Sequence, residues 1–309
     1  MTKIIYILIL AFVFQGCRNN EKQAGWGEPV LKNRTGWVSD TIANGYVWHN
    51  YTGYYGTFDS NQTVNVLEID LKKQYNVEFA YSESADSLSS FAEKYNAIAG
   101  INATYFEPEV SFVKTSGRIN CEVTIPEDHV RFWKHAAAVF YDKNTNSIEI
   151  KKGTNVGYKT SSCADIMSGA PLLIDNYNAV GFDFVGNTPD SILLSLDYED
   201  YRRHQGVRHP RVAIAVTNNR QLLLITVDGR WQSSAGMSCR ELTVFLQTHF
   251  NPVSALNLDG GGSTTMWIKD RGAEGSHVVN FPTDNKRYDH YGQRQVNSVI
   301  LIGKCADNL

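Results

Sequence analysis

Short apolar runs, each four to eight residues long, constrain the fold of this 309-residue chain more than any other feature. Runs of this length are typical of β-strands, because a helix needs roughly ten or more residues to bury one face. Asn218–Arg220 separates two runs and predicts a tight hairpin, since Asn tolerates a positive φ. The predicted strands are Val64–Leu71, Ala97–Ile101, Ala136–Tyr141, Ser147–Ile150, Val212–Thr217, Gln221–Val227, Ser254–Leu258, Thr264–Ile268 and Ser298–Ile302.

Helical periodicity stands out in two places. Ser238–Glu241 has the form of a capping box and opens a helix whose apolar side chains share one face. Asp86 is predicted to cap a second helix. Because strands outnumber helices and do not alternate strictly with them, the predicted fold class is α+β, with a mixed β-sheet core and a few packing helices. No linker or repeat divides the chain, so residues 37–305 are predicted to form a single large domain.

The first sixteen residues predict a signal peptide. An apolar run from Ile4 to Phe14 follows Lys3 and is too short to span a bilayer. Gly16-Cys17 resembles a bacterial lipobox, so Cys17 is predicted to be lipidated and residues 17–36 to form a lipid-anchored tether. The protein is then expected to be exported and attached to a bacterial membrane, on its periplasmic or cell-surface face. An ordinary signal peptide cut nearby, with Cys17 a bystander, is the alternative.

Net charge and cysteine spacing limit the partners of this chain. The formal net charge is −3, and without a basic excess no nucleic acid partner is expected. The cysteines beyond Cys17 match no zinc motif, and no cofactor or metal is predicted, although a divalent cation near Asp228 and Asp259 stays open. An even number of cysteines in an exported chain permits two disulfides, with four free thiols as the alternative. These cysteines are Cys121, Cys163, Cys239 and Cys305.

Polar motifs stand at the ends of four predicted strands, where loops commonly carry functional groups. Guanidinium groups of Arg208, Arg211 and Arg230 suit bidentate binding of phosphate. His209 is more typical of a hydrogen-bonded structural histidine than of a proton donor. The four motifs are Asn102, Arg208-His209-Pro210-Arg211, Asp228-Gly229-Arg230 and Asp259-Gly260-Gly261-Gly262-Ser263-Thr264.

The run Gly260-Gly261-Gly262 is the most unusual of these motifs. Glycines let backbone N–H groups approach a ligand without a Cβ in the way, and such nests bind anions. No Lys follows as in a Walker loop, and Thr265 stands where a nucleophile elbow needs its last Gly. We interpret the run as a binding element, with a flexible hairpin turn as the alternative.

In this order the motifs resemble the phosphodiester glycosidase family, from about Gly100 to Ile302. The glycine-run motif is quite specific, and the ordered set is more so. The matching segments are Gly100-Ile101-Asn102 with Tyr105-Phe106, Ser168–Leu173, Pro210–Ile214, Val227–Arg230 with Gly236-Met237-Ser238, Leu256–Met266, Val278–Pro282 and Arg294–Ser298.

The resemblance implies hydrolysis of a sugar-1-phosphodiester, with a glycan or glycosyl phosphate as substrate and the membrane met only through the anchor. It implies Asp259, Asp228, Arg211 and Asn102 as catalytic residues, with Asp259 the first choice for the essential carboxylate. The implied substrate-binding residues are Arg230, Arg208, Gly260, Gly261, Gly262, Ser263, Thr264, Asn280 and Arg294. One alternative is a glycan-binding surface lipoprotein without catalysis. Another is a serine hydrolase using Ser263, which the missing nucleophile elbow disfavours.

Overall fold

The computed structural model of the protein describes residues 31–32, 34–73, 75–181 and 188–305. The predicted signal peptide, Cys17 and most of the predicted tether lie outside these residues and stay predictions. Leu31 falls within the predicted tether but is buried in the core, and the Lys32 N–H donates to the His249 carbonyl, so packed structure begins before Trp37. Among the described residues, no helix is both long and apolar enough to cross a membrane.

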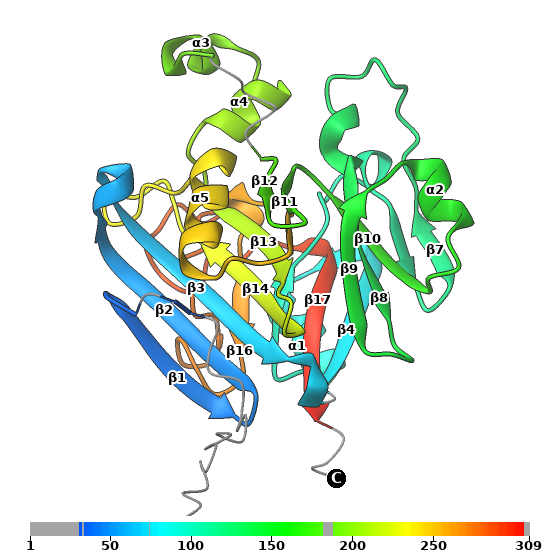
Figure 1. Ribbon diagram of the computed structural model, residues 1–309, viewed down its shortest axis with the longest axis horizontal. Coiled ribbons are helices and arrows are strands. Elements are labelled where there is room, and N and C mark those ends of the chain that lie inside the picture. Colours follow the sequence, from blue (N-terminus) through cyan, green and yellow to red (C-terminus); the bar gives the residue numbers. More distant parts are fainter. Residues whose placement is uncertain (1–30, 33, 74, 182–187, 306–309) are drawn as a thin grey trace, which may run out of the picture.

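Three sheets form the framework (Figure 1). The eight-stranded sheet has the order β1 (Trp37–Ala43), β2 (Tyr46–Tyr55), β3 (Ser60–Asp70), β14 (Gln221–Val227), β13 (Arg211–Val216), β15 (Ser254–Asn257), β11 (Leu172–Asp175) and β12 (Asn178–Ala179). The five-stranded sheet has the order β7 (Arg118–Cys121), β6 (Val113–Thr115), β10 (Asp165–Gly169), β8 (Ala137–Asp142) and β9 (Ser147–Lys152). The four-stranded sheet has the order β16 (Met266–Ile268), β5 (Ala99–Asn102), β17 (Val296–Cys305) and β4 (Tyr75–Asp86).

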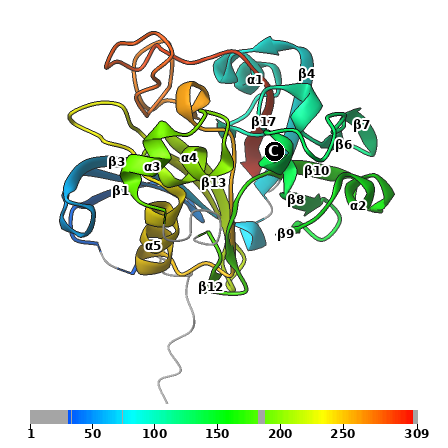
Figure 2. The same ribbon diagram turned by 90° about the horizontal axis from the view of Figure 1, so that it is seen from above.

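Three of the described helices pack on the sheets, and two stand at one end of the molecule. They are α1 (Leu88–Lys94), α2 (Asn155–Thr160), α3 (Asp190–Ser195), α4 (Tyr201–Gly206) and α5 (Cys239–His249). Helix α5 packs on the eight-stranded sheet, α1 on the four-stranded sheet and α2 on the five-stranded sheet. Helices α3 and α4 stand at one end of the molecule, beyond β13, and the end of β17 lies at the other (Figures 1 and 2).

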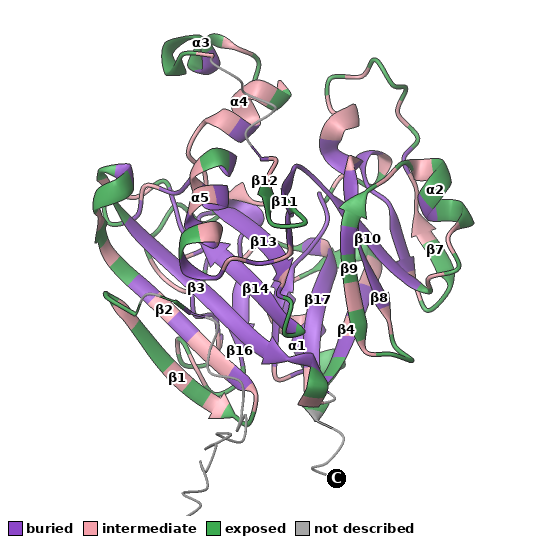
Figure 3. Ribbon diagram, in the orientation of Figure 1, coloured by how far each residue is buried: buried purple, intermediate pink, exposed green. Residues whose placement is uncertain are grey.

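The main core lies where the three sheets face one another, and Figure 3 shows the buried strands there. Strand β14 explains the continuous apolar run of the sequence. Leu222 and Leu224 enter this core, while Leu223 and Ile225 on the opposite face enter a second core under α5. Both faces of the strand are therefore buried, so both sets of alternating positions must be apolar.

The α+β class is confirmed, and each of the nine predicted strands overlaps a strand of the structure. The sheets differ from the expected mixed type, because every pairing between described strands is antiparallel. Parallel neighbours need a long crossover connection, usually through a helix, whereas several consecutive strands here, such as β13 and β14, join through short hairpins.

Local details correct two predictions. The cap of α1 is Ser87 rather than Asp86, because the Ser87 side chain accepts from the Ser90 N–H. The 218–220 hairpin is present, but the residue with positive φ is Arg220, at 61°, and neither Asn. This is the geometry of a three-residue loop whose last residue is left-handed.

The described cysteines decide whether the chain can form the two predicted disulfides. Cys121, Cys163 and Cys239 are free thiols, so two disulfides among the four cysteines are wrong. Cys239 is buried in the core beneath α5, where a thiol packs as a small apolar group.

Candidate active site

A cavity of about 380 Å³ opens beside the glycine run that follows β15. The α3–α4 segment contributes to its wall, at the end of the molecule where these helices stand (Figures 1 and 2). The predicted site residues that line the cavity are Arg211, Arg230, Asp259, Gly260, Gly261, Gly262 and Arg294.

Hydrogen bonds bring the strand-end motifs to this cavity. The Gly261 N–H donates to the Pro210 carbonyl at 2.8 Å, which holds the glycine run against the start of β13. The Asn102 Nδ2 donates to the Asp259 carbonyl at 2.7 Å, which ties the end of β5 to the same run. The expected convergence of distant motifs is therefore present.

Asp259 places a carboxyl group in the cavity wall, and only 8% of the residue is exposed. Burial raises the pKa of Asp259 to about 7, while Ser263, Lys134 and Arg294 lower it in part. The Ser263 hydroxyl lies close enough to the Asp259 carboxyl group to favour its ionised form. Its Oγ makes no hydrogen bond of ordinary geometry to a described residue. Near neutral pH this carboxyl group can therefore either donate or accept a proton.

Two guanidinium groups pack directly on the glycine run. A Cβ at Gly261 would lie 3.1 Å from Arg230 Nη2, and a Cβ at Gly262 would lie 2.4 Å from Arg294 Nη2. Arg294 Nε also donates to Asp284 Oδ1 at 2.9 Å. The missing side chains of the glycines are thus what allows both arginines to reach the cavity.

Comparison with known proteins identifies the family of this chain. The phosphodiester glycosidase family model matches residues 95–303, about two thirds of the chain, and that span contains the whole cavity lining. The chain belongs to the phosphodiester glycosidase family. Membership supports a glycosidase-type, hydrolytic function. A search of curated proteins found no match.

Solved structures share the fold of this family member. A hypothetical protein from Synechocystis superposes with a TM-score of 0.58 at 14% identity, over 86% of this chain and 63% of that one. The catalytic domain of zebrafish N-acetylglucosamine-1-phosphodiester alpha-N-acetylglucosaminidase, auto-inhibited by its pro-peptide, superposes with a TM-score of 0.59 at 15% identity, over 90% of this chain and 85% of that one. The chain thus spans less than two thirds of the Synechocystis protein. At these identities the likeness establishes the fold alone.

Two of the predicted groups in this phosphodiester glycosidase chain already have partners within the protein. Arg211 lines the cavity, but its Nε and Nη2 donate to the carbonyls of Met237, His204 and Val207, each at 2.8 Å. The amide of Gly261 is also occupied, by Pro210. The predicted amide nest is therefore reduced to Gly260 and Gly262 at most.

Two predicted asparagines lie behind the cavity wall of the glycosidase fold. Asn102 is 1% exposed, and its Oδ1 accepts from the Thr265 N–H at 3.0 Å while its Nδ2 holds Asp259. Asn280 is fully buried, and its Nδ2 donates to Asp228 Oδ1 and to the Thr264 carbonyl. Their polar groups have internal partners, so we assign both to holding the loops in place.

Asp228 also lies outside the cavity lining. Its Oδ1 accepts from Asn280 Nδ2 at 2.9 Å and from the Phe281 N–H at 3.0 Å. Burial raises the pKa of Asp228 to about 7, against smaller lowering by these two hydrogen bonds. Asp259 lines the cavity and Asp228 does not, so only Asp259 is placed to meet a molecule bound there.

Three further predicted residues are placed away from the cavity lining. Arg208 Nε donates to Glu241 Oε1 at 2.9 Å, so its charge is neutralised at the start of α5. Ser263 and Thr264 are buried, and their hydroxyl oxygens find no hydrogen-bond partner among the described residues. Among these described residues no histidine is hydrogen-bonded to Ser263, as the base of a serine hydrolase would be.

Several cavity residues were not predicted. Lys134 is 3% exposed, and its Nζ lies 2.9 Å from Glu199 Oε2 and 3.3 Å from Glu107 Oε2. A single lysine directly after two aromatic residues, in Phe132-Trp133-Lys134, was the available signal. The remaining unpredicted lining residues are Tyr105, Phe106, Tyr198, His204 and His209.

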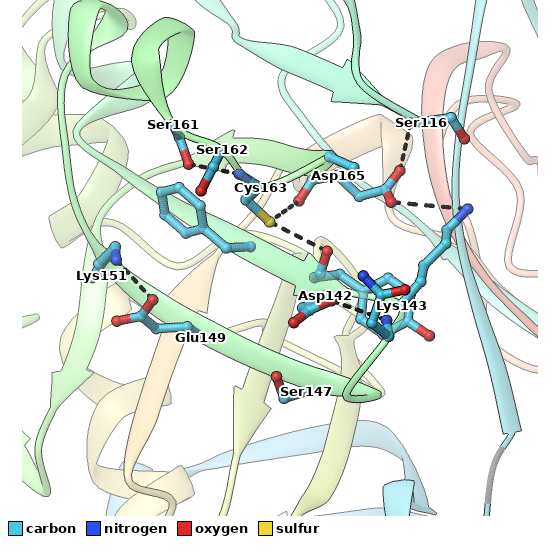
Figure 4. Close-up of a pocket in the computed structure, with 14 residues that line it drawn as sticks. Ser116, Asp142, Lys143, Ser147, Glu149, Lys151, Ser161, Ser162, Cys163 and Asp165 are labelled. Carbon is cyan, nitrogen blue, oxygen red and sulfur yellow. Dashed lines mark hydrogen bonds and ion pairs between the residues drawn. The ribbon is translucent and has the colours of Figure 1, made fainter.

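A larger hollow of about 730 Å³ lies on the five-stranded sheet, around the start of β10 (Figure 4). The buried Asp165 accepts from the Ser116 N–H through Oδ1, and its Oδ2 lies 3.8 Å from Lys143 Nζ. None of the predicted site residues lines it. In all the described ranges, this hollow included, no three His, Cys, Asp or Glu side chains gather as metal ligands.

Proposed function

We propose that this protein hydrolyses sugar-1-phosphodiesters and releases the sugar from its phosphate. One observation carries the proposal: in a chain of the phosphodiester glycosidase family, the carboxyl group of Asp259 shares a cavity with the guanidinium groups of Arg230 and Arg294. A carboxylate suits the sugar and guanidinium groups suit the phosphate, and both are present within one cavity.

The chemistry explains why this combination is useful. Cleavage at the anomeric carbon passes through a positively charged, oxocarbenium-like sugar, which a nearby carboxylate stabilises or attacks. The leaving group is a phosphate monoester, so its oxygen needs little protonation and its negative charge needs neutralising. Asp259 in its ionised form is proposed for the first task, and the arginines of the cavity for the second.

The test is release of sugar from a panel of synthetic glycosyl-1-phosphodiesters. Asp259→Asn is expected to lower turnover by roughly a hundredfold or more, because the variant cannot carry the negative charge. Since burial raises the pKa of Asp259 to about 7, the wild-type rate should increase as pH rises through about 7. Arg208→Gln, which removes an arginine outside the cavity lining, is the matched control and should retain turnover.

Other outcomes would contradict the proposal. Stoichiometric binding of the phosphodiesters without released sugar would favour a glycan-binding protein. Full turnover by Asp259→Asn would remove Asp259 from the reaction.

A further inference from the structure

Three arginines at or beside the cavity have no carboxylate partner among the described residues. Arg211 and Arg230 line the cavity, and the Arg203 guanidinium lies 5.9 Å from the ring centroid of Tyr198, which also lines it. Arg211 is bonded only to backbone carbonyls, and Arg230 makes a single long hydrogen bond, at 3.4 Å, to Thr283 Oγ1. Arg203 Nη1 donates to the Leu196 carbonyl at 2.6 Å. Among the described residues, none of the three arginines forms an ion pair.

The other cations of the cavity are neutralised. Lys134 lies between Glu107 and Glu199, and Arg294 is bonded to Asp284. The cations at or beside the cavity that no carboxylate neutralises among the described residues are therefore Arg203, Arg211 and Arg230. Uncompensated cations in a partly desolvated site are favourable only when an anion joins them.

His204 and His209 line the same cavity as Arg211 and Arg230. Their ring centroids are 5.9 Å apart, and Tyr198 contacts both rings. Arg211 holds His204 in place through its carbonyl, at the end of α4. His204 Nδ1 and His209 Nε2 have no hydrogen-bond partner among the described residues.

The surroundings of both histidines favour their neutral form. Burial, together with the charges of Arg211, Arg230 and Arg203, lowers the pKa of His209 to about 3. Burial also lowers the pKa of His204 well below its usual range. The charges that add to this effect on His204 are Arg211, His209, Lys134 and Arg230. The acidic residues that line the same cavity are Glu107, Glu199 and Asp259, and the first two pair with Lys134.

We propose that Arg203, Arg211, Arg230, His204 and His209 form an anion site for the phosphoryl group of the substrate, and that an anion bound there draws a proton from solvent onto the histidine pair. A negative charge among these groups offsets the arginines and favours the imidazolium form. Because binding linkage is reciprocal, a lower pH must then tighten anion binding. Assigning the anion to the substrate rests on the proposed function, whereas binding of an inorganic anion does not.

The experiment measures sulfate binding by calorimetry from about pH 8 to about pH 5, a range in which sulfate keeps its charge. Asp259 titrates in the same range and the same cavity, so the pH series uses the Asp259→Asn protein. Sulfate affinity is expected to increase by about tenfold toward the acidic end, with proton uptake that is visible when buffers of different ionisation enthalpy are compared.

Substitutions separate the charge from the proton. Arg230→Gln should weaken sulfate binding by about tenfold, the effect of one charge-assisted hydrogen bond, while Arg208→Gln should not. His204→Gln combined with His209→Gln should remove the proton uptake and the pH dependence. Arg211 is left intact because it is buried and holds three carbonyls.

Two results would overturn the proposal. Equal sulfate affinity in Arg230→Gln and Arg208→Gln would place the anion elsewhere, and a flat pH profile in the Asp259→Asn protein would remove the proton coupling. Thermal melting checks that each variant is folded. If sulfate binds as expected but no sugar phosphodiester is cleaved, the anion site stands and the proposed function fails.

Discussion

Single residues in this protein acquire their chemistry from what surrounds them. Asp228 and Asp259 both follow strands of the eight-stranded sheet, and burial raises the pKa of each to about 7. Only Asp259 lines the cavity, while Asp228 holds Asn280 and the Phe281 N–H. Two similar carboxyl groups therefore differ in access rather than in acidity.

Asp228→Asn should change how stability depends on pH. The pKa of Asp228 is higher in the folded state than the value of about 3.9 expected for an unfolded chain. The folded state therefore holds an extra proton between about pH 4 and pH 7, and its stability falls as pH rises through that window. Asn cannot ionise, so unfolding in urea should show a shallower fall, by on the order of 4 kcal/mol. Asp259 has the same sign, so some slope should remain. An unchanged slope would contradict the assignment.

Elements form where local patterning and packing agree. Helix α5 opens with the predicted capping box: the Glu241 N–H donates to Ser238 Oγ, and Glu241 Oε2 accepts from the Ser238 N–H. Its apolar face then covers the sheet. Strand β1 was missed because its residues are mostly partly or fully exposed at the sheet edge, so it carries no apolar run. Strand β2 was missed because polar residues and Gly53 interrupt its aromatic ones.

Ser238→Ala should destabilise the protein by about 1 kcal/mol, the usual cost of losing an N-cap hydroxyl. Urea unfolding at equilibrium measures the loss. Thr248→Ala is the matched control, since this exposed hydroxyl bonds only the Val244 carbonyl within the same helix. Equal effects of the two substitutions would show that the cap does not stabilise α5.

The molecule as a whole places its cavity where several strand ends meet. The glycine run packs on the start of β13 so closely that a Cβ at Gly260 would lie 2.5 Å from the Pro210 carbonyl oxygen. Strand β5 of the four-stranded sheet is tied to the same run through Asn102. The site therefore depends on how two sheets are joined.

Gly260→Ala should separate these segments. The backbone of Pro210 cannot move aside cheaply, so overpacking should cost roughly 1–3 kcal/mol and weaken sulfate binding. Gly56→Ala is the control, because an added Cβ at Gly56 would meet no atom within 4 Å. Thermal melting and calorimetry measure the two effects. Wild-type stability in Gly260→Ala would contradict the close packing.

The sequence alone determined the features that depend on near neighbours in the chain. Apolar runs such as Gln221–Val227 predicted strands, the capping box predicted α5, and the motif order predicted the family. These signals are local because backbone propensity and side-chain periodicity act over a few residues. The fold class followed from them.

Only the tertiary structure decided which polar groups meet the cavity. Arg208 was predicted to bind substrate but pairs with Glu241, and Lys134 was not predicted but lies between Glu107 and Glu199. Each outcome depends on a partner far away in the sequence. Charge pairing and burial depend on distances in space. Those distances between residues far apart in the sequence are set only when the sheets pack together.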